Sequence, residues 1–153
     1  MGSVNLYFQS FEFNASIYYL LRGLGKLLTG YNQIKVLGPI LSLTTVGIII
    51  YSATMVKRDN LDSLLASLFA SFAAYLLLAT TVHPWYLCML IILAMFQRSW
   101  WVLVWSGVVV WSYTTYMTPD FIQNLWLISV EYLVVFGCIW YYYRVQNRTI
   151  FKA

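Results

Sequence analysis

His83 is the only histidine of the 153-residue chain, and a proline follows it. Because proline lacks an N–H and has a fixed φ, Pro84 suits the first turn of a helix and places His83 just outside it. The unpaired N–H groups at a helix start favour an anion, and a histidine can add a hydrogen bond or a charge. His83 is therefore a candidate phosphate-binding residue. The alternative is that His83, Trp85 and Tyr86 only anchor the chain at a membrane interface.

Arg22 and Lys26 form a second candidate anion site. They follow Tyr18 at i, i+4, i+8 spacing. Apolar residues of the same stretch, from Phe11 to Gly30, recur at helical spacing and predict an amphipathic helix. Two cations one turn apart suit an anionic group, such as a lipid phosphate, at the membrane surface. The alternative is that both side chains simply reach toward lipid headgroups.

Glu131 lies about 10 Å inside the last apolar segment of the chain. Ionisable groups within membrane spans usually face the protein interior and find a partner there. Ser112, Tyr113 and Tyr116 of the preceding segment are candidate partners, so a structural hydrogen bond and direct ligand contact both stay open. The short apolar run over residues 84–97 favours a pocket near its outer end. The candidate pocket-lining residues are Trp85, Tyr86, Tyr113 and Glu131.

Membrane helices are the elements that must position these residues. The chain is 61% hydrophobic and only 9% charged, whereas roughly a quarter of the residues in soluble domains are charged. Continuous apolar runs favour helices over alternating strands, and a helix satisfies its own backbone in lipid. Four of five nearly charge-free segments approach the roughly 20 residues that a span needs, and the third is short. The five segments are Val36–Met55, Leu61–Val82, Pro84–Gln97, Trp100–Met117 and Asn124–Tyr143.

We therefore predict an all-α fold, a polytopic transmembrane helix bundle of about five spans with an outward-facing N-terminal amphipathic helix. Residues 1–34 are predicted to form an extracytoplasmic segment, and residues 35–153 a single bundle domain. The run from Thr29 to Asn32 predicts the end of the amphipathic helix, because Gly and Asn tolerate left-handed backbone. Residues 1–10 include NLYFQS, which resembles a protease-tag remnant, although the usual tag has Glu where Val4 stands.

Basic residues fall at alternate connections between the segments. The connections around His83 and over residues 118–123 contain neither Lys nor Arg. Because positive residues collect at cytoplasmic ends, the C-terminus is predicted to be cytoplasmic and His83 to lie outside. The basic residues predicted to lie inside are Lys57, Arg58, Arg98, Arg144, Arg148 and Lys152.

Several function classes are disfavoured by the composition. The net charge of +4 does not indicate nucleic-acid binding, because the nine Lys and Arg are scattered along the chain. Cys88 and Cys138 fall within apolar segments without a CxxC pair and are expected to be buried thiols. A single histidine and no cysteine cluster give no recognisable metal site, and no cofactor is predicted.

Several motifs together resemble the GT-C glycosyltransferases, in particular bacterial mannosyltransferase-like members that use a polyprenyl-phosphate sugar donor. The VHPWYL element at 82–87, with WS at 105–106 and SY at 112–113, is fairly specific. The resemblance covers almost the whole chain but only the C-terminal part of such an enzyme, and it favours NLYFQS as native sequence. The weaker matching pieces are Leu6–Phe8, Phe11–Tyr19, Gly30–Asn32, Thr80–Thr81, Asn124–Leu127 and Glu131–Tyr132.

The resemblance implies transfer of a sugar from a lipid-linked donor at the outer face of the bacterial inner membrane. Mannose as the sugar is implied by the resemblance alone. His83 matches the family's histidine near the donor phosphate, and Arg22 and Lys26 are weaker candidates for the same phosphate. The resemblance implies that the general base is an early-loop Asp of an N-terminal region, and no residue of this chain matches it. The chain is therefore expected to be inactive alone, with its catalytic residue unknown. Glu12 and Asp120 are expected to be solvated loop residues.

Two other interpretations stay open. One is a small non-enzymatic membrane protein that binds a lipid or a partner helix. The other is a transporter, which is weaker because the five segments show no inverted repeat. The enzymatic interpretation predicts membrane lipid, the polyprenyl-phosphate sugar donor and a missing N-terminal transmembrane region as partners.

Overall fold

The computed structural model of the protein describes residues 12–57, 60–117 and 119–150. The segment 1–10, Arg58 and Lys152 lie outside the described residues, as do the predictions that concern them. Over the described ranges the chain is helical, and its extended pairing is confined to one parallel bridge between Phe13 and Thr81. The predicted all-α fold class is confirmed.

Three helices are long and apolar enough to cross a membrane. They are α3 (Ile34–Thr54), α4 (Leu61–Leu78) and the part Leu125–Val145 of α7 (Leu125–Ile150). At about 1.5 Å per residue, a helix of this length reaches roughly 27–32 Å, close to the hydrocarbon thickness of a bilayer. The structure therefore supports the prediction of a membrane protein built from transmembrane helices.

The other two predicted spans are divided into shorter helices. The third consists of η1 (Pro84–Tyr86) and α5 (Leu87–Gln97). The fourth begins as α6 (Trp101–Val108) and continues as the 3₁₀ helix η2 (Val109–Met117). With 11 and 8 residues, α5 and α6 are each too short to cross a bilayer alone. The predicted count of five spans is not confirmed.

Two helix boundaries agree with the sequence analysis. The predicted amphipathic helix is α2 (Ile17–Thr29), which ends at Gly30 in left-handed geometry with φ of 79°. The N–H of Gly30 donates to the carbonyl oxygen of Lys26 at 2.8 Å and closes the last turn. His83 has extended backbone immediately before Pro84, the first residue of η1. Both predicted helix ends are confirmed because they depend on local backbone chemistry.

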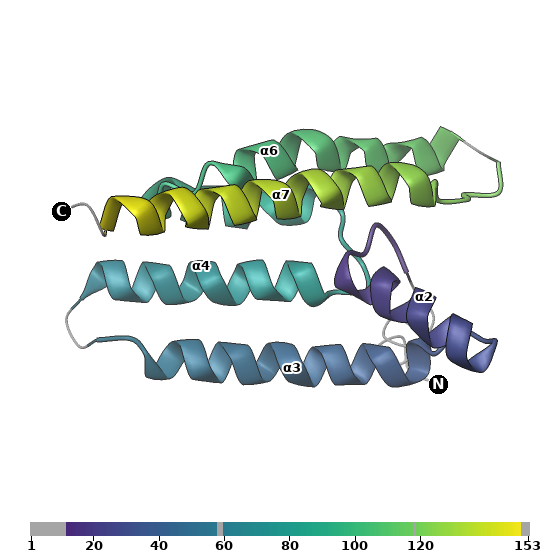
Figure 1. Cartoon of the computed structure of the whole chain (residues 1–153), viewed down its shortest axis with the longest axis horizontal. Coiled ribbons are helices and arrows are strands. Elements are labelled where there is room, and N and C mark those ends of the chain that lie inside the picture. The colour runs from purple at the N-terminus through teal and green to yellow at the C-terminus, as the bar shows by residue number, and fades with distance from the viewer. Residues whose placement is uncertain (1–11, 58–59, 118, 151–153) are drawn as a thin grey trace.

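The helices run back and forth between two ends of the molecule (Figure 1). α3 and α4 lie side by side, α6 and α7 form a second pair, and α2 crosses the end where α3 and α7 begin. Lys57, after α3, and Arg98, after α5, line one shared hollow. The Tyr142 hydroxyl of α7 donates to the Gln97 carbonyl oxygen at 3.2 Å, so this part of α7 lies next to the end of α5. The basic connections between helices therefore gather at the end opposite α2.

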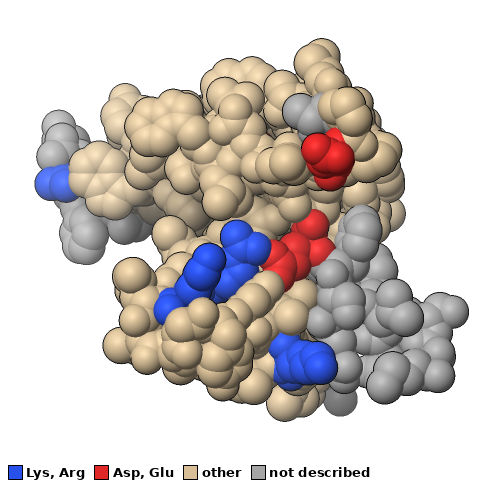
Figure 2. Space-filling view, turned by 90° about the vertical axis from the view of Figure 1, so that its right-hand side faces the viewer, with Lys and Arg blue, Asp and Glu red and all other residues tan. Residues whose placement is uncertain are grey.

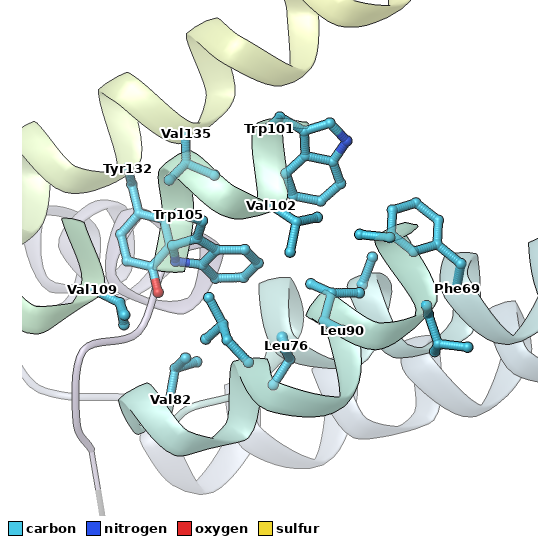
Figure 3. Packing of buried hydrophobic residues seen from close by; sticks show 14 of the residues in the cluster. Phe69, Leu76, Val82, Leu90, Trp101, Val102, Trp105, Val109, Tyr132 and Val135 are labelled. Carbon is cyan, nitrogen blue, oxygen red and sulfur yellow. The ribbon is translucent and has the colours of Figure 1, made fainter. Parts of the chain in front are cut away.

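Buried apolar side chains join α4, α5, α6 and α7 in one core (Figure 3). The fully buried ring of Trp105 lies 6.2 Å from the ring of Trp101 and 6.0 Å from that of Tyr132. Leu76 of α4 and Leu90 of α5 are also fully buried in this cluster. This core fixes α7 against α6, and it thereby sets the position of the α7 face that α2 approaches.

The two cysteines differ from the expectation of buried thiols. Cys88 is exposed, and Cys138 is half-buried at the edge of the core. Cys88 follows the fully buried Leu87, so it lies on a side of α5 turned away from the core. The prediction was wrong for Cys88 because a helix in lipid has apolar residues on its outward face as well as its inward face.

Candidate functional site

A groove of about 790 Å³ lies between α2 and α7 at the end of the molecule that carries α2. One wall is a single face of α7, whose lining residues recur at i, i+3, i+4, i+7, i+8 and i+11. This face extends along roughly 16 Å of the helix axis. Its polar groups are two hydroxyls, and the rest of the wall is apolar. The wall consists of Leu125, Ile128, Ser129, Tyr132, Leu133 and Phe136.

The opposite wall is formed by one face of α2. Tyr19, Arg22, Gly23 and Lys26 line the groove, and the Arg22 guanidinium lies 4.4 Å from the centre of the Tyr19 ring. The ammonium group of Lys26 is exposed and has no hydrogen bond or ion pair with any residue that the structure describes. The structure thus brings the predicted residues Arg22 and Lys26 together on one side of a groove whose other side is apolar.

Glu12 lies beside Arg22 and does not line the groove. Its carboxylate pairs with the Arg22 guanidinium and accepts hydrogen bonds from the Tyr18 hydroxyl at 2.5 Å and the Asn32 amide at 2.6 Å. The Glu12 side chain is 13% exposed, so the expectation of a solvated loop residue was wrong. Figure 2 shows basic side chains next to acidic ones near the centre of this face.

The pKa values of Tyr18 and Tyr19 are affected by burial and by the same cluster. Burial raises the pKa of Tyr18, and its hydrogen bond to the Glu12 carboxylate raises it further. Burial also raises the pKa of Tyr19 to about 12. Both phenols therefore act as neutral hydrogen-bond donors at ordinary pH, and the charges at this end of the groove belong to Glu12, Arg22 and Lys26.

Gln123 joins the loop before α7 to the segment before α2. Its amide oxygen accepts hydrogen bonds from the Asn14 backbone N–H and the Tyr19 hydroxyl, each at 2.8 Å. Its amide nitrogen donates to the Glu12 carbonyl oxygen at 2.9 Å. The two walls of the groove are therefore held at a fixed separation by a side chain that belongs to neither helix.

Glu131 has no exposed surface and does not line the groove. One of its carboxyl oxygens accepts hydrogen bonds from the Asn14 side-chain amide at 3.1 Å and the Trp105 indole at 3.3 Å. The adjacent Tyr132 hydroxyl donates to the Asn14 carbonyl oxygen at 2.7 Å. The partners of Glu131 are thus Asn14 and Trp105 rather than the residues expected from the sequence. Asn14, with φ of 46°, turns the chain toward α2.

His83, Trp85 and Tyr86 lie together, as their adjacency in sequence requires. The His83 ring stacks between Phe13 and Trp85, with centroid distances of 4.6 and 4.3 Å, and meets the edge of Tyr86 at 5.3 Å. Burial lowers the pKa of His83, which favours the neutral imidazole. His83 does not line the groove between α2 and α7. The structure therefore does not bring it into one pocket with Arg22 and Lys26.

Tyr113 belongs to the aromatic surface around His83 rather than to the groove. Its half-exposed ring lies 6.0 Å from that of Tyr116, which lies 5.8 Å from Phe13. Phe13 is held in place by backbone hydrogen bonds to Thr80 and Val82. The predicted pocket-lining residues Trp85, Tyr86 and Tyr113 are thus neighbours at one end of the molecule, and Glu131 lies in the interior below the groove.

Sequence reasoning missed Glu12, Asn14 and Gln123 as functional residues. A usable signal was present, because each is a carboxylate or amide residue next to an apolar segment. Polar groups that become buried need hydrogen-bond partners, so their presence indicates a network. Which partners they find depends on contacts between residues more than 100 positions apart.

No group of three or more metal-binding side chains occurs within the described part of the chain. Comparison with known proteins found no matching protein family, no matching curated protein and no matching solved structure.

Proposed function

We propose that this protein is a membrane protein whose groove between α2 and α7 binds a polyprenyl-phosphate sugar, as the donor-binding C-terminal portion of a GT-C-like glycosyltransferase. The observation that carries the proposal is a groove with two cations on one wall and an apolar helix face on the other. A lipid-linked sugar phosphate has the matching parts, because its phosphate joins a polar sugar to a long apolar chain. The motif resemblance described above supports the same donor.

The phosphate is assigned to the α2 wall. Lys26 offers an ammonium group without a partner among the described residues, and Arg22 offers the guanidinium N–H groups that Glu12 leaves available. Charge-assisted hydrogen bonds of this kind are the stronger class of hydrogen bond. The first isoprene units of the donor then lie along the α7 face, where Ile128, Leu133 and Phe136 offer apolar contact.

We propose five membrane passes, with the groove at the outer face of the membrane. α6 and η2 are continuous along the chain, and at about 1.5 and 2.0 Å per residue they rise roughly 30 Å together. η1 with α5 forms a shorter pass that begins below the surface. Lys57, Arg98 and Arg144 lie opposite α2, which favours that end as cytoplasmic. We assign the bacterial inner membrane on the family resemblance.

Sugar transfer from such a donor is a displacement at the anomeric carbon. Cations that hold the phosphate stabilise the negative charge that develops on the departing oxygen. Lys26 and Arg22 are assigned this role, and mannose is proposed as the sugar on the resemblance alone. No residue of this chain is assigned to deprotonate the acceptor hydroxyl.

His83 stays a predicted donor-phosphate residue. Its ring faces are covered by Phe13 and Trp85, so the ring edge is the part that can meet a ligand. The aromatic surface around it lies at the same end of the molecule as α2, because Phe13 precedes α2 and bonds to the loop before η1. Its contribution is tested separately from that of the groove.

The test is calorimetric binding of farnesyl-phosphate mannose to detergent-purified protein. We expect Lys26→Ala to weaken binding about tenfold, or about 1.4 kcal/mol, because the phosphate loses its unpaired cation. Lys35→Ala is the matched control, since Lys35 is an exposed lysine at the same end that does not line the groove. Equal losses in both variants, or none in Lys26→Ala, would contradict the groove assignment. His83→Ala in the same assay decides whether His83 contacts the donor.

The alternative function, a non-enzymatic lipid-binding protein, gives a different result in the same assay. Phosphatidylglycerol has an anionic phosphodiester and apolar chains but no hexose. If it binds as tightly as farnesyl-phosphate mannose, the groove recognises lipid phosphates in general and the glycosyltransferase proposal fails. Clearly tighter binding of the mannose compound supports a sugar donor.

A further inference from the structure

The charges around the groove are not all available to a ligand. Arg22 and Lys26 line the groove, and each has a positive charge. Glu12 does not line it, but its carboxylate pairs with Arg22. The net charge of Arg22, Lys26 and Glu12 together is one positive charge. A ligand in the groove therefore meets one compensated cation and one free cation.

Several contacts hold the Glu12 side chain in this position. Its carboxylate accepts hydrogen bonds from the buried Tyr18 hydroxyl and from the Asn32 amide, in addition to the pairing with Arg22. The Glu12 carbonyl oxygen accepts from Gln123, which fixes the backbone as well. Three donors directed at one carboxylate satisfy its oxygens and hold the side chain in one position. The Glu12 carboxylate is thus held next to Arg22, just outside the groove lining.

We infer that Glu12 is a specificity-determining residue, which makes the groove prefer singly charged lipid phosphodiesters to doubly charged lipid phosphomonoesters. This inference rests on the proposed function. Attraction to one net positive charge rises in proportion to the ligand's charge, whereas the cost of removing the ligand from water rises with its square. The second charge of a monoester therefore enters the groove without a counter-charge. Loss of the sugar leaves such a monoester, so the same preference favours its departure.

The first experiment uses the wild-type protein in phosphatidylcholine nanodiscs. Farnesyl methyl phosphate and farnesyl phosphate differ in charge but share the lipid chain and lack the sugar. Because the second pKa of a phosphomonoester is about 6, farnesyl phosphate has two charges at pH 8 and one at pH 5. We expect the diester to bind about tenfold tighter at pH 8, a size typical of one unit charge in a partly screened site, and both to bind equally at pH 5. At pH 5 both ligands have one charge, so titration of the protein affects the binding of both alike.

The second experiment changes Glu12 itself. Glu12→Gln keeps the side-chain length and an oxygen acceptor for Tyr18 but raises the local sum from one positive charge to two. We expect the preference for the diester at pH 8 to disappear. Asp120→Asn is the matched control, because it removes one negative charge from an exposed residue at the same end that does not line the groove. It should leave the preference unchanged.

The outcomes separate this inference from the proposed function. If neither farnesyl compound binds the wild type, the proposed function fails and the inference fails with it. If both bind and their ratio is the same at pH 5 and pH 8, Glu12 does not set the preference, although the groove still binds lipid phosphates. A ratio that Asp120→Asn changes as much as Glu12→Gln also overturns the inference. If Glu12→Gln does not fold, the wild-type ratio at the two pH values decides.

Discussion

At the scale of single residues, the charged side chains in and near the groove differ in their partners and in their roles. Glu12 compensates Arg22, whereas Glu131 is fully buried and accepts hydrogen bonds from two other buried residues. Lys26 is exposed and has no partner within the described part of the chain. The exposed cation is therefore the one suited to a ligand, and the buried carboxyl group is suited to holding the fold.

Substitution of Glu131 tests its structural role. Its carboxyl oxygen accepts from the Asn14 amide and the Trp105 indole, and the amide oxygen of a glutamine can accept both. We expect the free energy of unfolding of Glu131→Gln to be close to that of the wild type. We expect that of Glu131→Ala to be lower by about 2–5 kcal/mol, because two buried donors lose their acceptor. The measurement is equilibrium unfolding in detergent. Equal stability of the two variants would show that these hydrogen bonds contribute little.

At the scale of elements, the position of α2 depends on the segment before it and on the turn after it. Phe13 joins the chain to the loop before η1 through backbone hydrogen bonds, and the Ser16 hydroxyl donates to the Leu77 carbonyl oxygen at 2.6 Å. Gly30 then ends the helix and allows the chain to enter α3. These contacts attach a short helix across the end of the bundle, which gives the groove its second wall.

Replacement of Gly30 tests this turn. Its φ of 79° lies in the left-handed region, where a side chain is unfavourable by about 1 kcal/mol. We expect Gly30→Ala to lower the free energy of unfolding by about that amount and to weaken lipid binding. Gly47→Ala is the control, because Gly47 lies inside α3 with open space around its Cβ position, where alanine favours the helix. Both variants are compared by unfolding in detergent, and a loss in Gly47→Ala as large as in Gly30→Ala would refute the explanation.

At the scale of the whole molecule, the two ends differ in character. The end with α2 has the groove with Arg22 and Lys26, the aromatic surface around His83, and connections around His83 and over residues 119–123 that contain neither Lys nor Arg. The opposite end has Lys57 and Arg98 around one hollow. This difference underlies the proposed orientation, with the groove at the outer face of the membrane.

Labelling in intact cells tests the orientation. Single cysteines are introduced as Asp120→Cys and Lys57→Cys, in a background where Cys88 and Cys138 are replaced by serine. We expect a membrane-impermeant maleimide to label Asp120→Cys in spheroplasts and Lys57→Cys only after the membrane is permeabilised. The reverse pattern would place the groove on the cytoplasmic side and contradict the proposed outer-face donor site.

The sequence by itself determined the features that depend on local chemistry. Continuous apolar runs predicted about five membrane helices, of which three are long enough to span a membrane, and the positions of Gly30 and Pro84 predicted two helix ends. The spacing of Arg22 and Lys26 predicted that they share one helix face, and both line the groove. These predictions hold because hydrophobicity, helical periodicity and backbone φ act over a few residues.

Only the tertiary structure decided what that face meets. The opposite wall of the groove comes from α7. The hydrogen bonds from Asn14 to Glu131 and from Asn14 to Gln123 join positions more than 100 residues apart. The α6 segment changed to a 3₁₀ helix at Val109, which the apolar pattern did not distinguish from a continuous α-helix. The physical reason is that a uniformly apolar helix can pack on several faces. Its neighbours are chosen by the few buried polar groups that must find hydrogen-bond partners in the folded chain.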